Sequence, residues 1–202
     1  FRSFLLANLI TLLRFPLLFV YVALLYSGNA TAQYWCVPFI LGIIILDSVD
    51  GVIARARNEV SLLGSVLDIA TDRTLEIILW VVFAHLRLLP VVIPIIVITR
   101  GTTVDAVRAV GMSQGKAAFE QVQHPISRFI VASRFMRSSY GVAKAVAFAL
   151  LTLDLGMQTA GHPWQSNVHL AAVVVSWFAI SMTVIRGLPV LIEAYPMLRN
   201  GE

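Results

Sequence analysis

The sequence predicts an all-α, polytopic integral membrane protein with six transmembrane helices and both termini in the cytoplasm. Of its 202 residues, 58% are hydrophobic and 13% are charged, whereas about 25% are charged in an average soluble domain. No Asp, Glu, Lys or Arg occurs between Arg14 and Asp47, and only Asp154 interrupts residues 145–185. The basic residues are also distributed unevenly along the chain. Its length fits a single transmembrane domain over residues 1–202.

Polar turns divide the long uncharged stretches into helices of membrane-spanning length. A spanning helix needs roughly 20 mostly apolar residues, so the first stretch is divided at residues 27–31 and the second at 161–164. The second helix runs into an aspartate-rich segment, and the third follows it. A polar connection over residues 111–138 separates the fourth helix from the fifth. The six predicted helices are 5–26, 34–56, 64–85, 89–110, 139–157 and 167–190.

The basic residues indicate how these helices are oriented. Six spans place both termini on one side, where eleven Lys and Arg lie in loops and at helix ends, against only Arg87 on the other. This asymmetry favours cytoplasmic termini. The net charge of +4 is too small on so apolar a chain to suggest nucleic acid as a partner, and we expect the lipid bilayer instead. The eleven are Arg2, Arg14, Arg55, Arg57, Arg108, Lys116, Arg128, Arg134, Arg137, Arg186 and Arg199.

Four aspartates lie where the second predicted helix ends and the third begins. Spacings of three and four residues place Asp47 and Asp50 on one helix face, and Asp68 and Asp72 on one face of the next helix. Apolar sequence precedes both pairs, so the acids lie near membrane depth. An Asp at mid-bilayer costs roughly 2.5–3.5 kcal/mol on insertion scales. Neighbouring carboxylates also repel one another, so a cation must compensate them.

The residue types around these aspartates narrow the choice of cation. No His or Cys accompanies them, and ligands that are all oxygen favour Mg²⁺ or Mn²⁺ over zinc or copper. Such ions are commonly shared between carboxylates and substrate phosphates, and a pair of ions can hold the attacking and leaving oxygens of a phosphoryl-type transfer. Arg55 would direct a guanidinium at the same phosphates. Glu76 continues the face of Asp68 and Asp72 and would support them, form an ion pair or line a polar cavity wall.

These residues also match a known pattern. The chain reads Asp47-Ser-Val-Asp50-Gly51-Val-Ile-Ala54-Arg55, eight further residues, then Gly64-Ser-Val-Leu-Asp68-Ile-Ala-Thr-Asp72. This resembles the signature of the CDP-alcohol phosphotransferases, D-x-x-D-G-x-x-A-R followed after seven or eight residues by G-x-x-x-D-x-x-x-D. Six spans with cytoplasmic termini also agree with that family's fold. The resemblance implies transfer of a phosphatidyl group from a CDP-linked lipid such as CDP-diacylglycerol to the hydroxyl of an acceptor alcohol, with release of CMP.

Site residues follow from the resemblance by position. It implies that Asp47, Asp50 and Asp68 are metal ligands and that Asp72 shares a second metal or acts as general base, with two Mg²⁺ or Mn²⁺ ions. It also implies a cytoplasm-facing site and a homodimer, which we expect in the inner membrane of a bacterium. Because the chain begins at Phe1 without Met, we expect further residues upstream. The nucleotide pocket is assigned to Gly51, Ala54, Arg55 and Gly64, with Asn8 and Thr11 from the first helix.

Basic residues after the third helix suggest where the acceptor binds. Arg100 follows the apolar run 91–99 and would be buried unless it faced a cavity. The opening segment and the pair Arg100 and Arg108 resemble phosphatidylglycerophosphate synthases, which implies glycerol-3-phosphate as acceptor. Inositol phosphate, a cardiolipin-type acceptor or another alcohol stays open. Two other classes are alternatives. A carboxylate-lined ion transporter would have its acids spread along a pathway, and an intramembrane prenyltransferase would have two separated acid-rich clusters. The predicted acceptor residues are Arg100, Arg108, Arg134 and Arg137.

Overall fold

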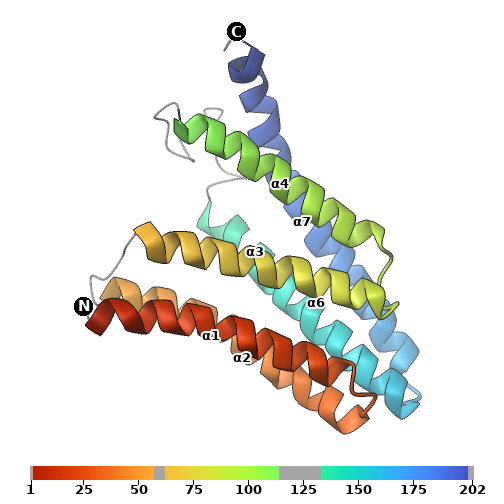
Figure 1. Cartoon of the computed structure of the whole chain (residues 1–202). Coiled ribbons are helices and arrows are strands. Elements are labelled where there is room, and N and C mark those ends of the chain that lie inside the picture. The colour runs from red at the N-terminus through yellow and green to blue at the C-terminus, as the bar shows by residue number, and fades with distance from the viewer. Residues whose placement is uncertain (1, 57–61, 114–132, 200–202) are drawn as a thin grey trace. The chain divides into compact units, whose positions relative to one another are not determined.

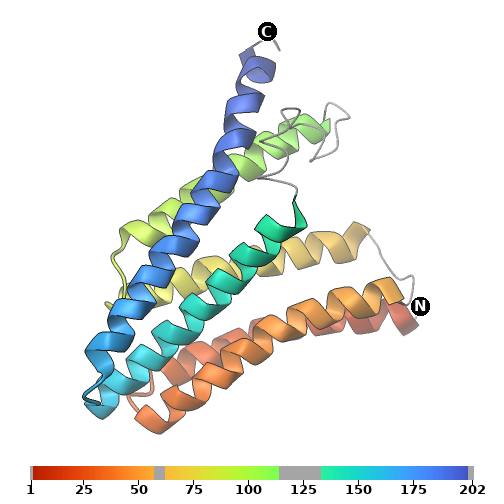
Figure 2. The same cartoon turned by 180° about the vertical axis from the view of Figure 1, so that it is seen from behind.

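The computed structural model describes residues 2–56, 62–113 and 133–199, and these residues form six α-helices and no strand. Every predicted helix is therefore present, and the all-helical class is confirmed for the described part of the chain. Figures 1 and 2 show the helices from two opposite sides. They are α1 (Arg2–Leu25), α2 (Ala30–Ala56), α3 (Leu62–His85), α4 (Val92–Ser113), α6 (Arg134–Ala160) and α7 (Gln165–Arg199).

Capping side chains explain why two helices begin earlier than the hydrophobic pattern predicts. The Oδ1 atom of Asn29 accepts hydrogen bonds from the backbone N–H groups of Thr31 and Ala32, so α2 begins at Ala30 rather than 34. The Oγ atom of Ser133 likewise accepts from the N–H of Met136, and α6 begins at Arg134 rather than 139. The predicted boundaries followed hydropathy, which does not register caps.

The last helix is longer than predicted. α7 continues to Arg199, whereas the sequence analysis ended it at residue 190. The predicted boundary marked the end of the apolar run, but a helix does not have to stop where its sequence becomes polar. Pro189 lies inside α7 and does not end it. A hydropathy boundary therefore marks the end of a predicted span, and the helix itself can extend beyond it.

Left-handed residues end two of the helices. At the end of α6, Gly161 has φ of 64°, and the N–H groups of Gly161 and His162 donate to the carbonyls of Gln158 and Met157. This is the Schellman arrangement, in which glycine is the usual residue. Arg87 takes the same position after α3 with φ of 60°, and the following Leu88 N–H donates to the Phe83 carbonyl. Leu88 and Phe83 are both buried, which accompanies this type of helix end.

The helices form two compact units, of which the first contains Phe1–Pro90 and Ala147–Val173. In this unit α1 packs against α2 and α3. Trp80 of α3 lies edge-on to Phe148 of α6, with ring centroids 4.8 Å apart. The hydroxyl of Tyr21 on α1 is hydrogen-bonded at 2.6 Å to the Thr152 hydroxyl on α6. These contacts build a core that brings α1 beside α3, the helix that carries the third and fourth signature aspartates.

The second unit contains Val91–Val146 and Val174–Glu202. Val104 of α4 and Val190 of α7 form one buried cluster in it. Ala143 of α6 packs with Ala179 and Met182 of α7 in another cluster. This unit holds the basic residues that the sequence analysis assigned to the acceptor.

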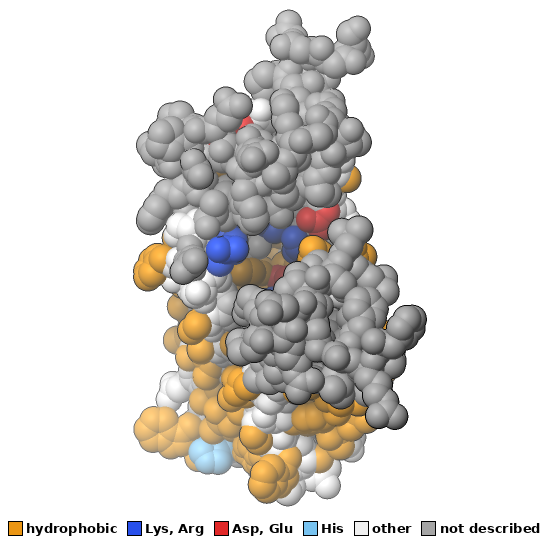
Figure 3. All heavy atoms as spheres, turned by 90° about the vertical axis from the view of Figure 1, so that its left-hand side faces the viewer, with side chains coloured by type: hydrophobic (Ala, Val, Ile, Leu, Met, Phe, Trp, Pro, Cys, Tyr) orange, Lys and Arg blue, Asp and Glu red, His pale blue; other side chains and the backbone are white. Residues whose placement is uncertain are grey.

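Large hydrophobic side chains lie on the outside of the helices. Phe19, Trp35 and Phe135 each have about two thirds or more of their surface exposed, at 66%, 71% and 72%, and hydrophobic side chains cover much of the described surface in Figure 3. Soluble proteins rarely expose such extensive apolar surface. Among the described residues, two segments are long and apolar enough to cross a membrane, Phe135–Ala160 and Gln165–Glu193, and Thr11–Leu25 and Ala30–Leu46 are shorter apolar helices.

Asp154, the one acidic residue within the uncharged stretch 145–185, lies on α6. Its side chain is fully buried in the first unit. Its carboxylate accepts hydrogen bonds from Gln165 Nε2 and, at the same distance of 2.7 Å, pairs with His169 Nδ1. A buried carboxylate needs such partners. These contacts join the end of α6 to the beginning of α7.

Candidate active site

Asp68 and Asp72 lie one turn apart on α3, as their spacing predicts. The helix begins at Leu62, so both residues belong to its first three turns. About half of each side chain is exposed, 51% for Asp68 and 49% for Asp72. The neighbouring Thr71 is buried, and its hydroxyl donates to the Leu67 carbonyl within the helix. The two carboxylates are therefore accessible on one side and packed against protein on the other.

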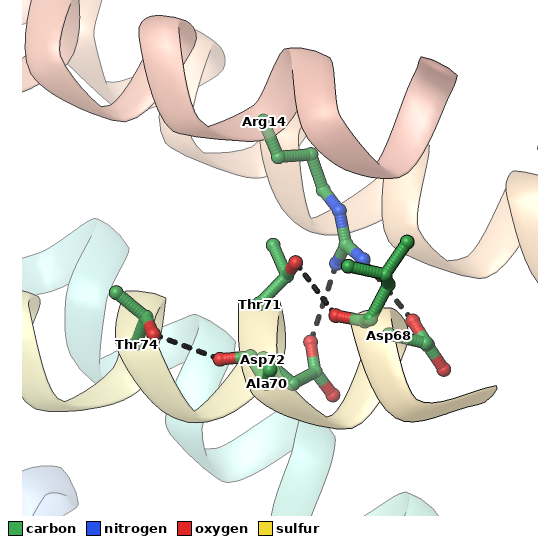
Figure 4. Close-up of polar contacts among 7 residues, drawn as sticks. Arg14, Asp68, Ala70, Thr71, Asp72 and Thr74 are labelled. Atoms are coloured by element: carbon green, nitrogen blue, oxygen red, sulfur yellow. Dashed lines mark hydrogen bonds and ion pairs between the residues drawn. The ribbon is translucent and has the colours of Figure 1, made fainter. Parts of the chain in front are cut away.

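Arg14 of α1 supplies a positive charge to both carboxylates. Its Nη2 atom donates to Asp68 Oδ1 at 3.1 Å, and its Nη1 atom donates to Asp72 Oδ1 at 3.3 Å. Figure 4 shows the guanidinium extending from α1 between the two aspartates. The Arg14 side chain is fully buried. One guanidinium thus bridges two successive turns of α3, a geometry for which its planar set of donors is suited.

The position of Arg14 corrects the sequence analysis, which counted it among the basic residues of cytoplasmic loops and helix ends. The structure places it near the middle of α1 and buries it. The apolar run on both sides of Arg14 contained the signal that could have identified it. A charge inside a predicted span normally has an internal partner, and Arg14 lies inside the predicted helix 5–26. Arg14 therefore supplies part of the positive charge that Asp68 and Asp72 need.

The other predicted metal and nucleotide residues are placed only by their helices. Asp47 and Asp50 lie in the last turns of α2, within the same unit as Asp68 and Asp72. Thr11 is buried one turn before Arg14, and Gly64 lies in the first turn of α3 with part of its surface exposed. The structure does not describe the side chains of Asn8, Asp47, Asp50, Ala54 and Arg55. It also does not describe the surroundings of Gly51.

Glu76 continues the aspartate face into the protein interior. It is buried one turn after Asp72, and its Oε2 atom lies 3.9 Å from Nη1 of Arg73. Of the three roles that the sequence left open for Glu76, the ion pair is present. The polar face of α3 therefore passes from two accessible carboxylates to one that is enclosed.

In the second unit, three cationic side chains come from three different helices. Arg100 of α4 packs so closely on Gly187 of α7 that a Cβ atom at position 187 would lie 2.7 Å from the arginine Nε. The Tyr140 ring of α6 has Lys144 Nζ at 5.6 Å and Arg186 Cζ at 5.5 Å from its centroid. Such distances are typical of cation–π contacts. The shared contact with the Tyr140 ring identifies Lys144 and Arg186 as members of this group, and only the fold reveals that contact.

The remaining predicted acceptor residues are less completely described. Arg137 is exposed in the first turn of α6. Arg108 lies on α4 and Arg134 begins α6, but their side chains fall outside the described residues. Lys116 and Arg128 lie in the segment 114–132, which is also outside them. Arg100 is thus the predicted acceptor residue whose packing the structure describes most fully.

Comparison with protein families decides the identity of the fold and its reaction. The model of the CDP-alcohol phosphatidyltransferase family matches residues 4–185. The chain belongs to the CDP-alcohol phosphatidyltransferase family. It is therefore a membrane enzyme of phospholipid biosynthesis that transfers a phosphatidyl group from a CDP-alcohol to an acceptor alcohol, and not an ion transporter. The match extends over both compact units. A comparison with curated individual proteins gives no match.

The family generally uses divalent metal ions, and the described side chains can be tested against that requirement. Asp68 and Asp72 offer carboxylate oxygens on one accessible face, the donor type that Mg²⁺ and Mn²⁺ prefer. Among the described side chains no group of three or more His, Cys, Asp or Glu gathers closely enough to hold an ion. The first two signature aspartates, whose side chains are outside that set, would complete the ligands. The donor chemistry therefore fits a hard divalent ion.

Proposed function

We propose that this enzyme transfers the phosphatidyl group of CDP-diacylglycerol to glycerol-3-phosphate and releases CMP. The observation that carries the proposal is the pair of half-exposed carboxylates, Asp68 and Asp72, held by the buried Arg14 within the family signature. In this scheme Asp47, Asp50, Asp68 and Asp72 hold two Mg²⁺ or Mn²⁺ ions. Those ions would supply positive charge that neutralises the diphosphate and the departing CMP.

The chain's own residues would arrange the substrates and move one proton. Asp72 accepts the proton of the acceptor hydroxyl. At the same time the hydroxyl oxygen of the acceptor forms a bond to the phosphorus that carries the lipid. The bond between that phosphorus and the oxygen of CMP breaks in the same transfer. The cytidine and diphosphate are held by Asn8, Thr11, Gly51, Ala54, Arg55 and Gly64. The burial of Thr11, one turn from Arg14, supports its place beside the site.

The same proposal covers the enzyme's place in the cell. The positive-inside rule supports six spans with both termini in the cytoplasm. A cytoplasm-facing site in the inner membrane of a bacterium would give access to a water-soluble acceptor and to CMP release, while the lipid donor approaches from the bilayer. A homodimer belongs to the same proposal through the family resemblance. The exposed apolar side chains of α1, α2 and α7 support contact with lipid.

The reaction can be tested directly with purified enzyme in nanodiscs. The enzyme is supplied with CDP-diacylglycerol, with Mg²⁺ or Mn²⁺, and with one acceptor at a time, and CMP release is measured. The acceptors are glycerol-3-phosphate, inositol phosphate, free inositol, serine and phosphatidylglycerol. We expect CMP release to be fastest with glycerol-3-phosphate, with phosphatidylglycerophosphate as the lipid product. Faster turnover with another alcohol would contradict the acceptor assignment and leave the reaction class intact. No acceptor-dependent CMP release would contradict the reaction.

Arg100→Gln should weaken binding of a phosphorylated acceptor. Arg100 packs on Gly187, whose neighbour Arg186 contacts the Tyr140 ring, so three cations in this unit could recognise one phosphate. A hydrogen bond to a charged group contributes about 1.5–3 kcal/mol, so we expect KM for glycerol-3-phosphate to rise about 10- to 100-fold. KM for CDP-diacylglycerol should change less than threefold.

The matched control for this variant is Arg87→Gln, which removes an exposed arginine from the loop after α3. It keeps a non-glycine residue at the left-handed position and should leave both KM values within threefold of wild type. Steady-state kinetics with each substrate varied in turn measure these constants. An Arg100→Gln enzyme with an unchanged KM for glycerol-3-phosphate would remove Arg100 from the acceptor site.

A further inference from the structure

Arg14 is a permanent positive charge in contact with two proposed metal ligands. A guanidinium does not lose its proton in proteins, so Arg14 remains cationic whatever its surroundings. Its two terminal nitrogens lie 3.1 and 3.3 Å from oxygens of Asp68 and Asp72. The arginine itself is fully buried, whereas each aspartate is half exposed. The two carboxylates therefore meet a fixed cation on the protein side and present their other side outward.

This arrangement compensates charge without a metal ion. Two carboxylates one helical turn apart repel each other, and burial of part of their surface strengthens that repulsion. The guanidinium offsets it from the opposite helix and links α1 to α3. One guanidinium therefore offsets part of the repulsion between Asp68 and Asp72 from within the protein. The same guanidinium repels a divalent ion that approaches the carboxylates, because both are positive.

We infer that Arg14 is the resident counter-cation of the metal-free enzyme and that it competes with the divalent ion for Asp68 and Asp72. The inference rests on the proposed role of these two aspartates as metal ligands. Binding free energies are reciprocal, so an ion that weakens the hold of Arg14 on the carboxylates is itself weakened by Arg14. The enzyme accordingly binds the divalent ion less tightly than its four aspartates alone would allow.

A purely positioning role for Arg14 leads to the opposite expectation. If its only task were to orient the two carboxylates, removing it would let them rotate, and the ion would bind less tightly. If its charge competes with the ion, removing that charge makes the ion bind more tightly. A neutral substitution at position 14 therefore separates the two roles by the direction of its effect on metal affinity.

The experiment measures Mn²⁺ binding without substrate, by electron paramagnetic resonance of unbound Mn²⁺ during titration of the purified enzyme in detergent. We expect Arg14→Gln to lower the Mn²⁺ Kd about tenfold. Arg14→Lys keeps the charge and should remain within threefold of wild type. The matched control is Arg73→Gln, which removes a charge one residue from Asp72 on the same helix, where the arginine lies beside Glu76. Its Kd should also stay within threefold.

Thermal unfolding of the same proteins gives a second readout. In excess EDTA, Arg14→Gln should unfold at a lower temperature than wild type, because the two carboxylates lose their counter-cation. Saturating Mn²⁺ should raise its unfolding temperature by more than it raises that of wild type, since the ion now compensates charge that Arg14 otherwise balances. Equal stabilisation of both proteins by Mn²⁺ would overturn the inference.

Each outcome of the Mn²⁺ titration has a defined meaning. An unchanged or higher Kd in Arg14→Gln overturns competition and leaves the proposed metal site standing. Equal tightening in Arg73→Gln also overturns it, since the effect would then be general. If Arg14→Gln does not fold, Arg14→Lys provides the test. A Kd for Arg14→Lys more than threefold above wild type would show that the planar donors of the guanidinium, and not its charge, determine Mn²⁺ affinity, and would overturn competition. Absence of Mn²⁺ binding in wild type refutes the proposed metal site itself.

Discussion

An Asp72→Asn enzyme should release CMP at least about a hundredfold more slowly than wild type. A positioned general base typically contributes 10²- to 10⁴-fold to the rate, and an asparagine side chain cannot accept the proton of the acceptor hydroxyl. The substitution preserves size and can still accept a hydrogen bond from Arg14 Nη1, which lies 3.3 Å from Asp72 Oδ1 in wild type. The loss should therefore appear in kcat, measured as CMP release at saturating CDP-diacylglycerol and acceptor.

Mn²⁺ affinity of the same variant separates the two roles that the sequence left open for Asp72. If Asp72 acts as base alone, the Mn²⁺ Kd of Asp72→Asn stays near that of wild type while kcat falls. If Asp72 also ligates the second ion, the Kd rises as kcat falls. Asp154→Asn is the matched control, because Asp154 lies in the same unit and pairs with Gln165 and His169. A folded Asp72→Asn enzyme with full turnover would exclude Asp72 as base.

The helices could be predicted because membrane insertion imposes a simple rule on sequence. Uncharged stretches of spanning length must be helical in a bilayer, and the polar turns at 27–31 and 161–164 separate the helices that the structure contains. The ends were harder to predict because they depend on local hydrogen bonds. Asn29 and Ser133 extend α2 and α6 by capping, and hydropathy carries no information about such caps.

The aspartate face could be predicted because its members are neighbours on one helix. A spacing of four residues was enough to place Asp68 and Asp72 one turn apart. Arg14 could not be assigned to them in the same way, since 54 residues separate it from Asp68 and only the packing of α1 on α3 brings the two together. The same holds for Asp154 with His169 and for Arg100 with Gly187. Contacts between helices depend on tertiary packing, which spacing within a helix does not encode.

Removal of divalent ions should abolish CMP release, and Mg²⁺ or Mn²⁺ should restore it. Arg14 carries one positive charge, whereas Asp68 and Asp72 alone carry two negative charges, the other signature aspartates add two, and the substrate diphosphate adds more. The protein's own counter-cation can therefore stabilise the metal-free fold but cannot also neutralise a departing CMP. CMP release is measured after dialysis against EDTA and again after each ion is added back.

This dependence also tests the donor set. Carboxylate oxygens on a compact helical face should suit the short bonds of about 2.0–2.1 Å that Mg²⁺ requires better than the 2.3–2.6 Å bonds of Ca²⁺. We therefore expect Ca²⁺ to restore little activity at concentrations at which Mg²⁺ restores most of it. Unfolding curves recorded in EDTA show whether the metal-free enzyme is still folded, which Arg14 should ensure. Full turnover of a folded enzyme in excess EDTA would contradict metal-dependent transfer.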